Sequence, residues 1–406
     1  MAKLIACPYC YETFSPRKIK FRCNSRLSRS NKRCAREHDP VLAARRSGAT
    51  GETGIVFEAD GRRSTALCPT CDNETTYRIC PICHNTLPAQ FGMVENKLIA
   101  MVGARNSGKT VFMTVLLHEL MNRVGENFGS ALMPADDETT KRFGTDYENT
   151  LYREGRLMGG TSSAAAVGAV DLSGSHGADL DSRVDPLVFR FGLTRQTLLG
   201  PRPQNVVLSF FDTAGEDFNS LEKVQVHTRY LANADGIILV MDPLQMPGAR
   251  AQALPGTLLP GAENTEAAEN VLNRVTEMLL ARSRKNALIS TPVAVVFSKM
   301  DALWHTLERG SRLAAQPSRT GRFDVADSRD VHEEVRDLLR TWHGVSLDQT
   351  LRTGYARYRY FGVSALGRTP TADSRVARTG IQPYRVTEPL LWLLSEFGSV
   401  PKQGRG

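Results

Sequence analysis

The sequence predicts an α/β fold, a doubly wound and mostly parallel sheet, with a small cysteine-rich module ahead of it. From Lys97 onward, short apolar runs alternate with amphipathic stretches, a pattern typical of βαβ units. All eight cysteines lie between Cys7 and Cys83, and the rest of the chain has none. The chain has 406 residues, 41% of them hydrophobic, which fits two or three domains of roughly 150 residues each.

A change of composition near Pro88 and Gly92 marks the first expected domain boundary. We expect a zinc-binding module over residues 1–92 and an α/β nucleotide-binding domain over residues 93–406. Residues 159–182 are rich in Gly, Ala and Ser and follow neither the helical nor the strand period. This segment is therefore expected to be an insertion in the second domain.

Apolar runs and helical periodicity predict the elements of the second domain. The run KLIAMVG, 97–103, indicates a buried strand, and apolar residues at helical spacing over 109–124 indicate the helix after it. Further strands are expected over 188–193, 206–211, 236–241, 292–297 and 358–363, and further helices over 220–232, 262–281, 331–342 and 388–397. No apolar run approaches the ~18 residues of a membrane-spanning helix. The first residues lack a secretory signal, so we expect a cytoplasmic protein.

The segment GARNSGKT, Gly103–Thr110, matches the phosphate-loop pattern G-x-x-x-x-G-K-[ST]. Its setting between an expected strand and an expected helix argues against a chance match in a glycine-rich turn. Lys109 is expected to contact the β- and γ-phosphates and the Thr110 hydroxyl to bind Mg²⁺. Nucleotide contacts are expected from Gly103, Arg105, Asn106, Ser107, Gly108, Lys109 and Thr110. For Arg105 and Asn106, a place on the solvent-exposed side of the loop is an equal alternative.

Three further motifs follow apolar strands, where an open α/β sheet binds its ligands. The first is DTAGE, in which Asp212 reaches Mg²⁺, usually through water, and the Gly215 N–H senses the γ-phosphate. The second is SKMD, Ser298–Asp301, and the third is VSAL, which holds Ser364 and Ala365. An ordinary strand-to-helix cap is the alternative explanation for SKMD, and VSAL alone carries no argument.

In this order the four motifs resemble the Ras-like small GTPases and the wider TRAFAC class, over about residues 97–398. The resemblance implies that Asp301 accepts hydrogen bonds from guanine N1–H and N2–H₂, and that Lys299 packs along the base. It also implies that the Ala365 N–H donates to guanine O6. Ser298 stands where Asn or Thr is commoner.

Glu216 follows the D-x-x-G glycine, where many Ras-like proteins have the Gln that orients the attacking water. A carboxylate accepts from water but does not donate to the transition-state oxygens, so we expect slow GTP hydrolysis with Glu216, Lys109 and Thr110 as catalytic groups. The cysteine cluster, the phosphate loop, DTAGE and a strand ending in Met-Asp-Pro-Leu also resemble the double-GTPase family of bacterial conflict systems. That resemblance implies paired GTPases that regulate an effector.

The cysteines form three C-x-x-C knuckles and one further pair, enough for two tetrahedral Cys₄ zinc sites. The simplest grouping joins Cys68, Cys71, Cys80 and Cys83 at one ion and Cys7, Cys10, Cys23 and Cys34 at the other. Interleaved groupings stay open. His38 and His84 are alternative ligands, and a redox role for the knuckles is a rival explanation.

The formal net charge is +8, and nine Lys or Arg without any acid lie between Arg17 and Arg36. Eight zinc-bound thiolates would cancel much of the basic excess of the module. We therefore expect a GTP-binding switch with GTP or GDP, Mg²⁺ and two Zn²⁺ as cofactors and a protein effector or second GTPase as partner. The alternatives are a zinc-dependent nucleic-acid-binding protein gated by a P-loop NTPase domain, and an ATPase of similar topology.

Overall fold

The computed structural model describes most of the chain. The described residues are 4–46, 50–104, 106–124, 130–158, 186–197, 200–210, 228–261, 268–281, 287–315, 317, 321–371 and 373–404. The expected insertion 159–182 lies outside them, as do Arg105, Asp212, Gly215 and Glu216.

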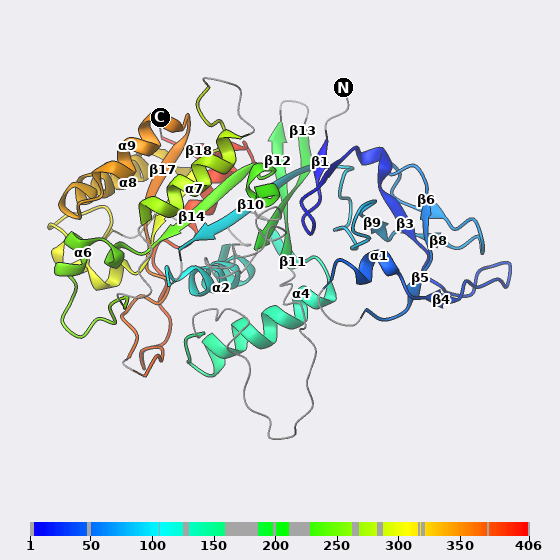
Figure 1. Ribbon diagram of the computed structural model, residues 1–406, viewed down its shortest axis with the longest axis horizontal. Helices are drawn as coiled ribbons and strands as arrows, with labels where there is room; N and C mark the ends of the chain where they lie inside the picture. Colours follow the sequence, from blue (N-terminus) through cyan, green and yellow to red (C-terminus); the bar gives the residue numbers. More distant parts are fainter. Residues whose placement is uncertain are drawn as a thin grey trace.

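A seven-stranded sheet runs through the described part of the chain after residue 94 (Figure 1). Its order is β11 (Ala131–Pro134), β12 (Leu187–Thr197), β13 (Gly200–Phe210), β10 (Glu95–Gly103), β14 (Gly236–Met241), β15 (Val293–Phe297) and β17 (Tyr358–Gly362). Strands β13, β10, β14, β15 and β17 are mutually parallel, while β12 is antiparallel to β13 and to β11. This confirms the predicted doubly wound, mostly parallel sheet.

Helices cover both faces of this sheet because successive residues of its buried strands point to opposite faces. On β10, Ile99 and Met101 belong to the core with α2 (Lys109–Glu119) and α10 (Glu388–Glu396). Leu98 and Ala100 belong to the core on the other face. There they share it with α7 (Ala268–Leu280), α8 (Val325–Thr341) and α9 (Val345–Gly354).

Several elements differ from the prediction in extent. β12 and β13 form a long hairpin in which β13 begins at Gly200, six residues before the predicted apolar run. Its first half is polar or exposed, so no apolar run marks it. α8 begins at Val325 because the Asp324 carboxylate accepts from the N–H groups of Ala326 and Asp327. The predicted helix 220–232 is described only from residue 228, where it is helical to residue 232.

The remaining elements after residue 94 are short or were not predicted. They are η2 (Leu120–Val124), α4 (Asp137–Arg142), η3 (Phe143–Arg153), η5 (Pro243–Gln245), α6 (Pro247–Ala251), η7 (Met300–Ala302), η8 (Trp304–Thr306), β16 (Phe323–Asp324) and β18 (Lys402–Gln403). Within the described ranges, no helix has the length and apolar character required to cross a membrane.

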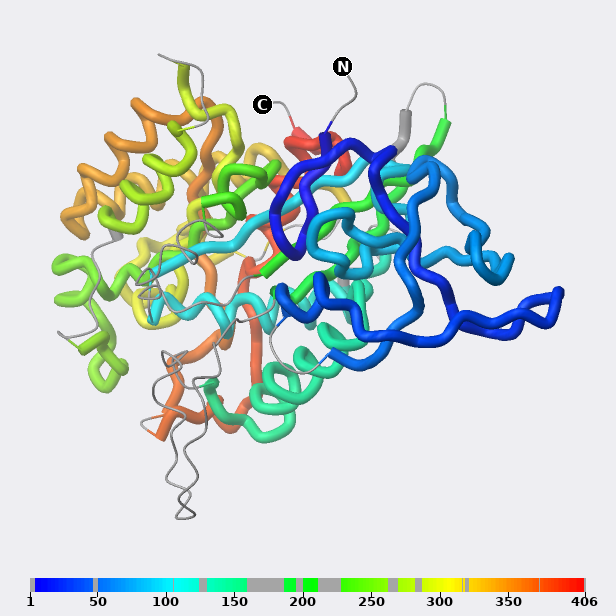
Figure 2. The backbone as a smooth tube through the Cα atoms, turned by 45° about the vertical axis from the view of Figure 1, so that its right-hand side comes forward, coloured from blue at the N-terminus to red at the C-terminus, as the bar shows by residue number. Residues whose placement is uncertain are grey.

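The N-terminal module is built from very short strands and turns. Its central sheet is β6 (Val56–Glu58), β3 (Lys20–Arg22) and β9 (Arg78–Ile79). The other elements are β1 (Ile5–Ala6), β2 (Thr13–Phe14), η1 (Pro16–Lys18), β4 (Arg36–Glu37), α1 (Pro40–Ala43), β5 (Thr53–Gly54), β7 (Ala66–Leu67) and β8 (Glu74–Thr75). Figure 2 shows the module at one side of the sheet, with the loop between β3 and β4 projecting away from the rest of the molecule.

Candidate nucleotide site and cysteine clusters

The phosphate loop turns sharply between the end of β10 and the start of α2. A Cβ on Gly103 would lie 2.5 Å from the Val240 carbonyl oxygen and 2.8 Å from Ser107 Oγ, so only glycine fits there. Gly108 has φ 77° and precedes the first turn of α2, and no side chain caps that turn. The structure places Lys109 and Thr110 in this turn. The open N-terminus of an 11-residue helix favours an anion.

Ser298, the first residue of SKMD, joins the end of β15 to the phosphate loop. Its hydroxyl lies 2.6 Å from the Ser107 carbonyl oxygen and 3.1 Å from that of Met241, and its side chain is buried. The shorter Ser in place of Asn or Thr therefore still connects β15, β14 and the loop.

Lys299 is held in place by the phosphate loop and by a buried acid. Its Nζ donates to the Asn106 carbonyl oxygen at 2.8 Å and lies 2.5 Å from Asp242 Oδ2. Asp242 is fully buried and also accepts from the Leu244 N–H at 2.9 Å. The prediction missed Asp242 as a site residue, although it follows the apolar strand β14 directly and precedes a proline. The ion pair fixes the ammonium and leaves the Lys299 stem along one wall of the site.

Asp301 presents a buried carboxylate at the end of β15, where 9% of the residue is exposed. Ser364 Oγ donates to its Oδ1 at 2.6 Å, and Thr369 Oγ1 lies 3.4 Å from its Oδ2. Burial raises the pKa of Asp301, and the hydrogen bonds from Ser364 and Thr369 oppose that shift. The side chains of Ser298 and Asp301 do not cap η7, so the cap alternative for SKMD is wrong.

A cavity of about 170 Å³ opens beside these groups. It is lined by Gly108, Val111, Leu157, Leu244, Thr257, Leu258, Ser298, Lys299, Asp301, Ala302, Ala365, Leu366, Thr369 and Pro370. Most of its wall is apolar, with one carboxylate and one ammonium stem. Such a site suits a planar ring that carries hydrogen-bond donors on one edge.

The site therefore unites most of the predicted residues that the structure describes. The carboxyl ends of β10, β14, β15 and β17 stand next to one another, which brings the phosphate loop, Asp242, SKMD and VSAL together. Leu157, Thr257 and Leu258 come from loops and had no motif to announce them. The DTAGE prediction lies outside the described residues.

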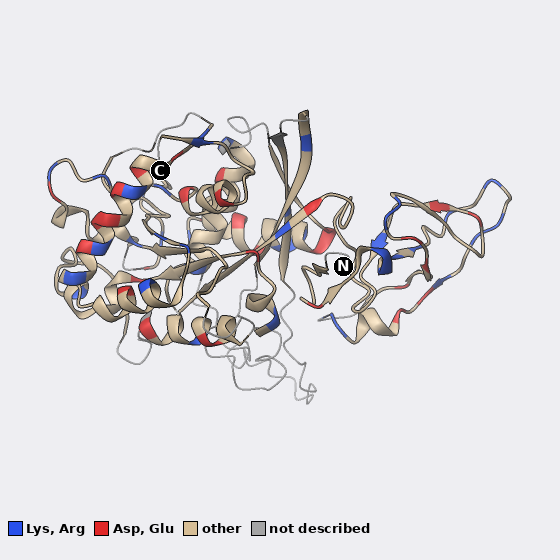
Figure 3. Ribbon diagram, turned by 90° about the horizontal axis from the view of Figure 1, so that it is seen from above, with Lys and Arg blue, Asp and Glu red and all other residues tan. Residues whose placement is uncertain are grey.

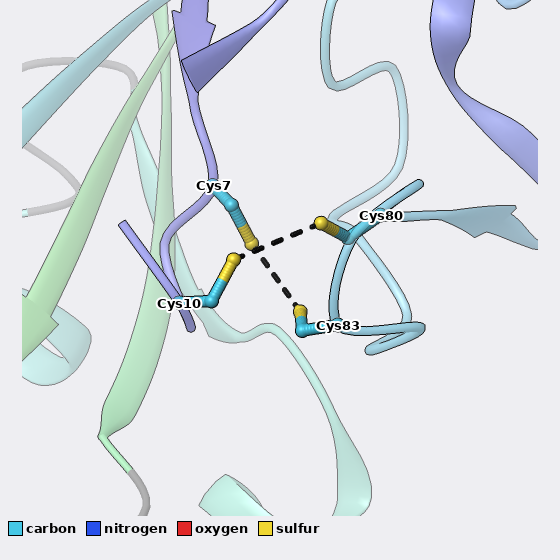
Figure 4. Close-up of side chains that lie close together, drawn as sticks. All are labelled: Cys7, Cys10, Cys80 and Cys83. Carbon is cyan, nitrogen blue, oxygen red and sulfur yellow. Dashed lines mark hydrogen bonds between the residues drawn. The ribbon is translucent and has the colours of Figure 1, made fainter. Parts of the chain in front are cut away.

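The eight cysteines form two Cys₄ clusters, and their grouping corrects the simplest prediction. One cluster is Cys7, Cys10, Cys80 and Cys83 (Figure 4), and the other is Cys23, Cys34, Cys68 and Cys71. The first and last knuckles thus share a cluster, which is one of the interleaved groupings that the sequence left open.

The sulfur spacing fits a tetrahedral metal ion. Adjacent sulfurs lie 3.8 and 3.9 Å apart in the first cluster and 3.6 and 3.7 Å apart in the second. Four sulfurs at the Zn–S distance of about 2.3 Å would be separated by about 3.8 Å. None of the eight cysteines forms a disulfide.

Backbone N–H groups that follow three of the cysteines point at their sulfurs. The N–H groups of Tyr9, Ile82 and Ser25 lie 3.3–3.4 Å from the sulfurs of Cys7, Cys80 and Cys23. Such donors stabilise thiolates and so favour a metal ligand. His84 belongs to neither cluster, and its Nδ1 lies 3.0 Å from both carboxylate oxygens of Asp39. His38 is exposed and belongs to neither cluster.

No protein-family model matches the chain. A search of curated proteins found the "Putative ESX-1 scaffolding and assembly protein SaeC" of Mycolicibacterium smegmatis (strain ATCC 700084 / mc(2)155). It is 28% identical over 418 residues, which cover 97% of this chain and 99% of that protein.

Among solved structures, the Ski7 GTPase-like domain of S. cerevisiae, bound to GDP and inorganic phosphate, matches 75% of this chain with 13% identity and a TM-score of 0.30. The match covers 50% of that chain, about half its length. The Arl6 BBS3 small GTPase of Trypanosoma brucei matches with 15% identity, 75% and 98% coverage and a TM-score of 0.26. The G domain of the T. maritima FeoB iron transporter matches with 11% identity, 68% and 91% coverage and a TM-score of 0.24. At these TM-scores the matches add nothing to the strand order described above.

Proposed function

We propose that this protein is a GTP-binding switch that hydrolyses GTP slowly and relays its nucleotide state to a protein partner. The observation that carries the proposal is the Asp301 carboxylate, buried in the cavity beside the phosphate loop. The loop and the carboxylate belong to neighbouring motifs that Ser298 joins directly.

The preference for guanine follows from the hydrogen-bonding capacity of Asp301. An ionised carboxylate has only acceptors, which pair with guanine N1–H and N2–H₂ but offer adenine N1 no donor. Ser364 takes up only part of the Oδ1 capacity, because an ionised carboxylate has about four acceptor sites. Ala365 lines the cavity from the turn that follows β17, from where its N–H would donate to guanine O6.

The phosphates and their metal would be held at the other end of the site. Lys109 would contact the β- and γ-phosphates, and Thr110 with Asp212 would bind Mg²⁺. Glu216 would accept from the attacking water without donating to the γ-phosphoryl oxygens, which is our reason for proposing slow hydrolysis.

Zinc is our proposal for both Cys₄ clusters, since four thiolates at tetrahedral spacing suit this ion. A reducing compartment such as the cytoplasm would keep the thiols available.

The relative from M. smegmatis supports a protein partner, because its name describes scaffolding and assembly of ESX-1. We propose that the partner of this chain is a component of a comparable protein assembly. The resemblance to double GTPases makes a second GTPase the other candidate.

Titration of the full chain with GTP and with ATP, in Mg²⁺, tests the proposal. GTP should bind more tightly, and Lys109→Ala should nearly abolish binding of the triphosphate because the β/γ charge would lose its cation. Equal affinity for the two nucleotides, or a preference for ATP, would contradict the guanine assignment.

A nucleic-acid-binding role is the second candidate, and the loop between β3 and β4 favours it. Four basic side chains of this loop are exposed, Arg26, Arg29, Lys32 and Arg33, and so is Arg36 at the start of β4. In Figure 3, Lys and Arg mark this outermost loop of the module. Affinity for a duplex that falls steeply with salt would support this role, and no binding at low salt would exclude it.

A further inference from the structure

The first cysteine knuckle packs against the sheet. Cys7, Tyr9 and Tyr11 share one hydrophobic core with strands β10, β13 and β14. The Tyr11 ring is fully buried, and its centroid lies 4.8 Å from that of Tyr230. Cys7 is therefore part of the core that contains the central strands, and Cys10 packs against that core.

A chain of hydrogen bonds leads from this knuckle into β13. Ser209 Oγ donates to the Pro8 carbonyl oxygen at 2.8 Å. Because that hydroxyl has only one proton, Tyr11 OH is the donor in the 3.0 Å contact between Tyr11 OH and Ser209 Oγ. Both Pro8 and Tyr11 thus hold the same fully buried serine.

The series of hydrogen bonds continues from Ser209 to β10, at the point where the pairing of β10 and β13 ends. Their pairing ends at Ala100 and Ser209. Beyond it, Tyr230 OH donates to the Ser209 carbonyl oxygen at 2.6 Å and accepts from the Met101 N–H at 2.7 Å. A tyrosine hydroxyl thus bridges the two strands just before β10 enters the phosphate loop.

The same knuckle holds the helical residues 228–232 and the turn after them. Asn233 Nδ2 donates to the Tyr11 carbonyl oxygen at 2.8 Å, and Arg229 forms a 2.7 Å ion pair with Glu12. The knuckle therefore contacts the described chain on both sides of the segment that contains DTAGE.

The second cluster has a different environment. Its core consists of its own cysteines with Phe21 and Phe57, and Ile55, Ala59 and Ala66 pack against it. Its sulfurs accept from Ser25 and Asn73, both within the module. It provides a chemically matched control for the first cluster.

We propose that the cluster Cys7, Cys10, Cys80 and Cys83 is a positioning element of the nucleotide site, so that its metal and the nucleotide bind cooperatively. This inference rests on the proposed binding of GTP. A metal ion holds the knuckle closed, and the knuckle holds Ser209 and Tyr230, which set the spacing of β10 and β13. Loss of the metal loosens the strand end that carries the phosphate loop, and linkage requires the nucleotide to stabilise the metal in return.

The test compares two double variants that remove equivalent knuckles. Cys80→Ser with Cys83→Ser opens the first cluster, and Cys68→Ser with Cys71→Ser opens the second. We expect the first variant to lose roughly fivefold or more in GTP affinity and the second to bind like the unmodified protein. Equal GTP affinity in all three proteins would overturn the inference and leave the proposed function standing, whereas no GTP binding by the unmodified protein would remove both.

A measurement without any substitution covers the case in which the first variant does not fold. Zinc transfer from the full chain to a chromogenic chelator is followed with and without GTP and Mg²⁺. We expect one of two zinc ions to leave more slowly when GTP is present and the other to leave at an unchanged rate. Transfer curves that GTP leaves unchanged would overturn the inference.

Discussion

The two Cys₄ clusters have the same ligands and nearly the same sulfur spacing, yet they occupy different environments. The first cluster belongs to the large core that it shares with strands of the central sheet, and the second belongs to a small core within the module. The four cysteines of a cluster therefore determine which metal ion binds, and the residues packed around the cluster determine which part of the protein that metal stabilises. We expect metal at the first cluster to stabilise the nucleotide-binding domain, and metal at the second to stabilise only its own module.

Removing two cysteines from each cluster in turn should produce the largest difference in stability between the two clusters. Cys80→Ser with Cys83→Ser should lower the free energy of unfolding of the whole chain by roughly 4 kcal/mol or more, because loss of a metal is among the most destabilising changes. Cys68→Ser with Cys71→Ser should leave the main transition in place and remove only structure near the module. Thermal unfolding followed by far-UV circular dichroism measures this, and equal losses in the two variants would erase the distinction.

The hydroxyl of Tyr11 allows the same comparison with a single substitution in each region. Tyr11→Phe should lower the free energy of unfolding by about 1 kcal/mol, because it removes one buried hydrogen bond to Ser209 and keeps the ring in place. Tyr77→Phe is the matched control in the module, since Tyr77 is 49% exposed, and it should change stability by less than about 0.5 kcal/mol. Urea unfolding of both variants gives the two values. If Tyr77→Phe lowers the free energy of unfolding as much as Tyr11→Phe does, the buried hydroxyl has no special role.

The smallest effect is expected at the loop between β3 and β4. Arg29→Ser with Arg33→Ser should change the free energy of unfolding by less than about 0.5 kcal/mol and should leave GTP affinity unchanged, because both side chains are exposed. Denaturant unfolding and nucleotide titration of this variant check both statements. A marked loss of GTP affinity would mean that the second region also acts on the nucleotide site.

The sequence predicted six of the seven described strands of the sheet and the phosphate loop, because these patterns are local, but it missed the short edge strand β11. Buried parallel strands are short apolar runs, and the loop needs Gly103 and Gly108 at fixed spacing. The grouping of cysteines was not predictable, because two C-x-x-C knuckles 70 residues apart in sequence meet only in the folded chain. Asp242 acts through Lys299 from a neighbouring strand, a contact that no local pattern announces.

The assignment of GTP depends most directly on one side chain. Asp301→Asn replaces an acceptor by a donor, which suits the O2 acceptor of xanthine and leaves a guanine donor poorly paired, at a cost of roughly 1–3 kcal/mol. Competition binding with GTP and XTP on the unmodified protein and the variant is therefore the decisive measurement. We predict that the variant loses GTP affinity and gains XTP affinity while its zinc content stays unchanged. Equal GTP affinity in the two proteins would contradict the account and reduce the assignment to a P-loop protein of unspecified nucleotide.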